Sequence, residues 1–73
     1  MSTFDEFQVL VFSYRLDNPA QREGQAAFNA LFAVHPEIAE RVRSDFRVDP
    51  FDDDDRLPAF MAFVRRHLDE VTA

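Results

Sequence analysis

Apolar side chains recur with the spacing of an α-helix in the first part of the chain, residues 3–17. One face of such a helix carries Phe4, Phe7, Leu10, Val11 and Tyr14. The run Val9–Phe12 also fits a strand, but the sequence before it, Thr3-Phe4-Asp5-Glu6, is a capping box and favours a helix. The opposite face carries Val9, Phe12 and Leu16. This helix is therefore either central in the fold or offers a second apolar surface to a partner.

Prolines divide the rest of the chain into three more segments with helical periodicity. Asn18-Pro19 predicts the start of a second helix, since asparagine is a good N-cap and proline suits the first helical position. Its predicted inner face is Ala20, Gly24, Ala27, Phe28, Leu31 and Val34. A short helix is predicted after His35-Pro36, and its inner face consists of Ile38, Ala39, Val42 and Phe46. The clearest stripe, from Arg56 to Val71, consists of Leu57, Phe60, Met61, Val64, Leu68 and Val71.

The second helix carries two further features. Its small inner residues allow close approach of another helix, which is a reason for Gly24 at a position where glycine costs about 1 kcal/mol relative to alanine. Arg22, Gln25 and Asn29 form a polar stripe on its outer side. These groups either hydrogen-bond the turn at Asp49-Pro50-Phe51, which is the favoured interpretation, or bind a ligand.

Four such segments predict an all-α fold, a compact bundle of about four short helices in one domain over residues 1–73. A core this small is usually reinforced by disulfides, but the chain has no cysteine and nine phenylalanines. The net charge of −6 argues against a nucleic-acid-binding protein, which would need a basic patch, and against attraction to anionic membranes. With no signal peptide or membrane-spanning run apparent, we expect a cytoplasmic protein.

The residues needed for catalysis or metal binding do not occur in a recognisable pattern. Neither Asp45 nor Asp49 begins an EF-hand calcium loop, because the central glycine and the final glutamate are missing. His35 and His67 have no partner at metal-ligand spacing, and no serine lies in a nucleophile elbow. We therefore expect no catalytic residue, no metal and no cofactor. An enzyme whose site is assembled by oligomerisation is the alternative.

Carboxylates are concentrated between residues 45 and 55, which we call the acidic segment. They are Asp45, Asp49, Asp52, Asp53, Asp54 and Asp55, with Glu37 and Glu40 as possible neighbours. One interpretation is a solvated loop that caps the last helix, whose N-terminus stabilises negative charge. The sharper one is mimicry of nucleic acid: in an extended chain, alternate side chains lie about 6.5–7 Å apart, close to the spacing of phosphates along a strand.

Part of the sequence resembles a known group of proteins. The matching stretches are Asn18-Pro19, Arg22–Leu31, His35-Pro36-Glu37, Asp49–Asp54 and Leu57–Phe60. Together they resemble very short proteins encoded by bacteriophages and other mobile elements of GC-rich bacteria. The resemblance implies no reaction and no site residues. It does suggest an inhibitor of host machinery, since some anti-CRISPR proteins are similar in size and charge.

Two functions follow as predictions. The first is a non-enzymatic inhibitor of the anti-CRISPR kind, in which the acidic segment blocks the basic surface of a host nucleic-acid-binding protein without binding nucleic acid itself. The second is a small assembly protein that self-associates, as a homodimer, or docks through apolar helix surface. Its interface would consist of Val9, Phe12, Leu16 and Phe32.

Overall fold

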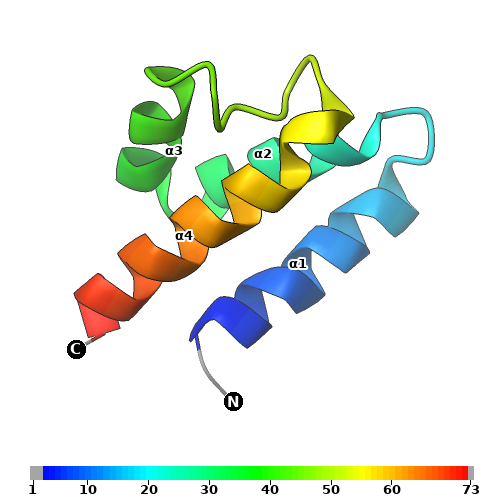
Figure 1. The fold of residues 1–73 in the computed structure, drawn as a ribbon. Coiled ribbons are helices and arrows are strands. Elements are labelled where there is room, and N and C mark those ends of the chain that lie inside the picture. The colour runs from blue at the N-terminus through cyan, green and yellow to red at the C-terminus, as the bar shows by residue number, and fades with distance from the viewer. Residues whose placement is uncertain (1–2, 73) are drawn as a thin grey trace.

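The computed structural model describes the backbone of residues 3–72 and the side chains as far as residue 68. Its helices are α1 (Thr3–Asp17), α2 (Glu23–Val34), α3 (Pro36–Arg43) and α4 (Leu57–Thr72), with a 3-10 turn, η1 (Asp54–Arg56), directly before α4. The described residues contain no strand, so the predicted all-α bundle of four helices is confirmed. Helices α1 and α4 lie side by side in opposite directions, with α2 behind them (Figure 1).

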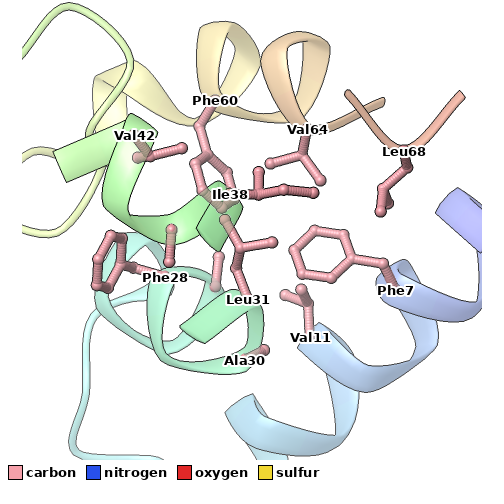
Figure 2. Close-up of a cluster of buried hydrophobic side chains, with 12 residues drawn as sticks. Phe7, Val11, Phe28, Ala30, Leu31, Ile38, Val42, Phe60, Val64 and Leu68 are labelled. Carbon is pink, nitrogen blue, oxygen red and sulfur yellow. The ribbon is translucent and has the colours of Figure 1, made fainter. Parts of the chain in front are cut away.

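The core forms where the inner faces of all four helices meet (Figure 2). Phe60 of α4 is fully buried and its ring lies 6.2 Å from the ring of Phe7 in α1, centroid to centroid. Leu31 of α2 is also fully buried, between α1 and α4. Burial of this apolar surface is the main stabilising contribution, because the chain has no disulfide to reinforce it.

The amphipathic pattern of α1 is confirmed. Phe7 and Val11 are buried, and the core is completed on this side by partly buried Phe4, Leu10 and Tyr14. Thr3 already belongs to α1, so the residue that would cap this helix lies outside the described residues. On the other side, Val9, Phe12 and Leu16 remain 60%, 60% and 66% exposed. We call these three residues the outer stripe of α1.

The predicted start of α2 is wrong. Asn18 does not cap α2 but ends α1, because its backbone N–H and its side-chain Nδ2 both donate to the carbonyl of Tyr14 at 3.0 Å. Residues 18–22 form a turn, and α2 begins at Glu23. Ala20 is consequently exposed in the turn instead of lying on the inner face of a helix. Val34, at the last residue of α2, is also largely exposed.

Two further expectations about packing need correction. Phe46 does not point inward: α3 ends at Arg43, and Phe46 lies in the turn beyond it with 72% of its surface exposed. The guanidinium of Arg56 lies over its ring, 5.8 Å from the centroid. The space beside Gly24 is filled by the backbone of Pro50 and not by another helix, because the long connection between α3 and α4 crosses α2 there.

Candidate functional site

The acidic segment does not form the extended row that mimicry of a nucleic-acid strand requires. Its backbone turns at once, since the amide of Val48 donates to the carbonyl of Asp45 at 3.0 Å. It bends again at Phe51 and Asp52 and then enters the 3-10 turn η1. An extended chain places alternate side chains about 6.5–7 Å apart. The acidic segment is not extended and therefore lacks this regular spacing.

Asp45 and Asp49 each stabilise a turn within the segment. The Asp45 carboxylate accepts from the Arg47 amide at 3.0 Å and from its guanidinium Nε and NH2 at 3.1 Å each. The side-chain hydrogen bond to Arg47 is the main reason that the pKa of Asp45 lies below its usual value. Asp49 accepts from the amide of Phe51 at 3.0 Å. Such side-chain contacts to the backbone two residues on are typical of turn-forming aspartates.

Asp53 and Asp54 cap different helices. Asp53 is the N-cap of η1, where its carboxylate accepts from the amide of Asp55 at 3.0 Å and lies 3.5 Å from Nε of Arg56. The carboxylate of Asp54 accepts from the amide of Gly24 at 2.9 Å, in the first turn of α2. Amides in the first turn of a helix have no partner within the helix. Asp54 supplies such a partner for the Gly24 amide, although the two residues are thirty positions apart in the sequence.

The remaining carboxylates are more exposed. The side chain of Asp52 is 91% exposed and lies 3.9 Å from NH2 of Arg22, and Asp55 is also exposed. Glu40 pairs with Arg43 at 3.2 Å, and Glu37 lies 3.8 Å from Nδ1 of His35. Arginines thus lie beside several of the predicted contact residues. The carboxylates of the acidic segment stabilise its turns in addition to giving it negative charge.

The polar stripe on α2 includes one residue with the predicted structural role. Arg22 donates from NH2 to the carbonyl of Phe51 at 2.8 Å, so it holds the turn that follows Asp49-Pro50. Asn29 contributes differently, because its Nδ2 lies 3.5 Å from Oε1 of Gln21 in the turn before α2. The interpretation of Arg22 as a support for this turn is confirmed.

The outer stripe of α1 borders a shallow hollow. Its volume is about 330 Å³, and its lining is Phe12, Arg15, Leu16, Pro19, Gln21 and Glu23. Arg15 and Glu23 form an ion pair at 3.1 Å across it, with about half of each side chain exposed. An apolar stripe beside a hollow with both charges at its edge can bind another apolar helix surface, whose flanking polar groups would meet the ion pair.

Phe32 does not belong to this surface. It follows Phe28 by one helical turn, and Phe28 packs edge-on against Phe51 with ring centroids 5.7 Å apart. Ala30, on the opposite side of α2, lies beside Val11 of α1 (Figure 2). The predicted interface of four residues is therefore divided: three lie on α1, and Phe32 faces the side of α2 nearer the connection between α3 and α4.

The histidines are occupied by local contacts. Nδ1 of His67 lies 3.0 Å from the carbonyl of Phe63, and its ring stacks on that of Phe63 with centroids 4.1 Å apart. Among the residues that the structure describes, no group of three histidine or acidic side chains could hold a metal ion. No helix in the same range is both long and apolar enough to cross a membrane.

Comparisons with protein-family models, with curated proteins and with solved structures find no match to this chain. The resemblance to short phage-encoded proteins stays a prediction.

Proposed function

We propose that this chain is a non-enzymatic binding protein whose contact surface is the outer stripe of α1. One observation supports the proposal. The three apolar side chains of the outer stripe are each at least 60% exposed, on the side of α1 that faces away from the core. The corresponding face of a helix on the surface of a globular protein normally carries polar and charged residues.

These three side chains can stabilise a complex by the hydrophobic effect only when a partner covers them. Full burial of a phenylalanine, leucine or valine side chain stabilises by about 1.5–3 kcal/mol relative to exposure. Single exposed apolar residues are ordinary on protein surfaces. Here three of them lie on one stripe of a single helix, and two of the three, Phe12 and Leu16, line the hollow between α1 and the start of α2. A contiguous patch of this kind is typical of an interaction site.

Site-specific photo-crosslinking in producing cells tests this proposal. A photoreactive residue at position 12 is expected to give a covalent adduct, because a partner covers the outer stripe. The matched control is the same residue at position 32, where Phe32 is also exposed but lies on α2, away from the outer stripe. Adducts at position 12 and none at position 32 support the proposal. No adduct at position 12, or equal adducts at both positions, would overturn it.

The predicted inhibitor remains a second proposal, supported by the surface around Phe46. This aromatic residue is 72% exposed next to Asp45 in the chain, and the side chain of Asp52 in the same acidic segment is 91% exposed. We propose in this case that the acidic segment binds a basic protein surface in the cytoplasm. The test is the double variant Asp52→Asn and Asp55→Asn, which leaves the capping residues Asp53 and Asp54 in place. Loss of salt-sensitive binding to a basic nucleic-acid-binding protein would support it, and unchanged binding would contradict it.

A further inference from the structure

We infer that the outer stripe of α1 binds a second copy of this chain, with the two α1 helices antiparallel. The inference rests on the proposed function, since it identifies the partner for the same surface. Three properties of α1 support it: the spacing of the exposed residues, the distribution of charge along the helix, and the exposed area of the outer stripe.

The spacing is that of a helix–helix seam. Asp5, Val9, Phe12 and Leu16 follow one another at intervals of four, three and four residues, the alternation found along the contact line of coiled coils. A stripe that is straight along one helix can pair with an identical stripe about a two-fold axis. With Val9 opposite the partner's Phe12, the reciprocal contact of Phe12 with the partner's Val9 follows by symmetry. Such an interface closes at two copies.

The charges on α1 favour the antiparallel orientation. The first turn is acidic, with Asp5 and Glu6, and the last turn carries Arg15 together with Asp17, so that Arg15 is the basic residue available to a carboxylate of the partner. In the antiparallel register, Asp5 lies opposite the partner's Leu16 and next to the partner's Arg15. A parallel pair would instead bring Asp5 against the partner's Asp5 within the apolar seam, where like charges repel strongly. The antiparallel pair also aligns the helix dipoles favourably.

Arg15 can bind Glu23 of its own chain and the partner's Asp5 at the same time. It holds Glu23 at 3.1 Å, yet 48% of its side chain remains exposed. A guanidinium carries five N–H donors in a planar fork, so one edge can bind Glu23 while another binds a carboxylate across the interface. The ion pair at the edge of the hollow thus presents Arg15 toward an incoming helix.

The available area indicates a reversible dimer. A standard interface buries about 800 Å² on each partner, out of the 4706 Å² accessible here. The outer stripe alone exposes roughly 300 Å², so even with the polar residues that flank it the interface is small and of the transient class. Because association also costs translational and rotational freedom, we expect a weak dimer that dissociates on dilution.

Sedimentation equilibrium of the purified chain, from about 1 μM to about 1 mM, tests the inference directly. We expect a monomer–dimer equilibrium. Phe12→Ser is expected to weaken it at least about tenfold, and the matched control Phe46→Ser to leave it unchanged. Phe12 is exposed in the monomer, so circular dichroism should show the same fold in both variants.

The outcomes separate this inference from the proposed function. A chain that stays monomeric throughout, together with a crosslinked adduct at position 12 heavier than two copies, overturns the dimer and leaves the binding surface in place. A monomeric chain with no adduct at position 12 overturns both. Equal weakening by Phe12→Ser and Phe46→Ser overturns the assignment of the interface to α1.

A charge exchange tests the orientation. Asp5→Arg and Arg15→Glu are each expected to weaken the dimer, and the double variant to recover at least part of the lost affinity. Both residues also have contacts within their own chain, so thermal unfolding should accompany each measurement. A double variant that dimerises no more tightly than either single variant would exclude the antiparallel arrangement.

Discussion

The carboxylate of Asp54 accepts a hydrogen bond from the backbone amide of Gly24 at 2.9 Å, which joins the start of α4 to the start of α2. The carbonyl of Pro50 lies against Gly24 on the same side, where a side chain would otherwise be. Together with the bond from Arg22 to Phe51, this contact fixes the connection between α3 and α4 on the first turn of α2. The stability of the fold should therefore depend on Asp54 and on Gly24.

Asp54→Ala is expected to destabilise the protein by about 1 kcal/mol, the usual effect of removing a side chain that caps a helix. The matched control is Asp55→Ala, which removes the same charge from the neighbouring exposed position. Its effect should stay within about 0.5 kcal/mol, the range of ordinary surface substitutions. Urea unfolding measures both. Equal losses would show that charge near α4, and not the contact with Gly24, is what matters.

Gly24→Ala is expected to destabilise the protein by about 2 kcal/mol, although alanine is the better helix former by about 1 kcal/mol. The added methyl group would overlap the carbonyl oxygen of Pro50 and lie 2.9 Å from the Asp54 carboxylate. Backbone atoms cannot move aside as a flexible side chain can. Gln25→Ala, one residue later in the same helix, adds no such overlap and serves as control. Stabilisation by Gly24→Ala would refute the close approach.

The ion pair of Asp45 with Arg47 predicts a pH dependence. The hydrogen bond from Arg47 holds the pKa of Asp45 below its ordinary value of 3.8 in the folded state. Its contribution to stability is therefore present above pH 3.8 and is lost as the pH falls through the lower folded pKa. Urea unfolding of the native protein and of Asp45→Asn should differ most above this window and converge below it.

Arg47→Gln provides the control for this experiment, because it removes the partner and keeps the carboxylate. Its stability should fall less steeply than that of the native protein as the pH decreases through the same range. An identical slope in the variant and the native protein would mean that this ion pair does not contribute.

Phe60→Ala is expected to cost about 3–5 kcal/mol, because it empties the centre of the core. A domain of this length has a free energy of unfolding of roughly 4–11 kcal/mol, so the variant should be partly or wholly unfolded near room temperature. Phe46→Ala removes the same type of side chain from an exposed position and should cost about 1 kcal/mol or less, including its contact with Arg56. Comparable melting temperatures for the two variants would contradict the assignment of the core.

Periodicity alone was sufficient to predict the helices and most of the core. The inner faces of α1 and α4 pack as their spacing indicates, with Phe7, Val11, Phe60, Val64 and Leu68 all buried. The errors lie at helix ends. Phe46 was assigned to the core by continuing the period of α3 beyond Arg43, where the helix has already ended. Asn18-Pro19 suits a helix start, but the same asparagine can end the preceding helix, as it does here.

The roles of the individual aspartates could not be predicted from the sequence. A capping residue just before α4 can be predicted from the local sequence. Asp53 has this role as the N-cap of η1, which directly precedes α4. The role of Asp54 depends on where the chain crosses α2, thirty residues away, which no local pattern encodes. Adjacent identical residues therefore differ in role: Asp53 and Asp54 accept hydrogen bonds from backbone amides, whereas the side chains of Asp52 and Asp55 are exposed.

The contact between Gly24 and Pro50 also limits how this sequence can diverge. Any substitution at position 24 requires the connection to be rebuilt, whereas the exposed carboxylates can change freely without altering the fold. Distant homologues should therefore retain a glycine in the first turn of the second helix together with an acidic residue about thirty positions later. This pair of positions, more than the overall acidity, is the signature by which such homologues can be recognised.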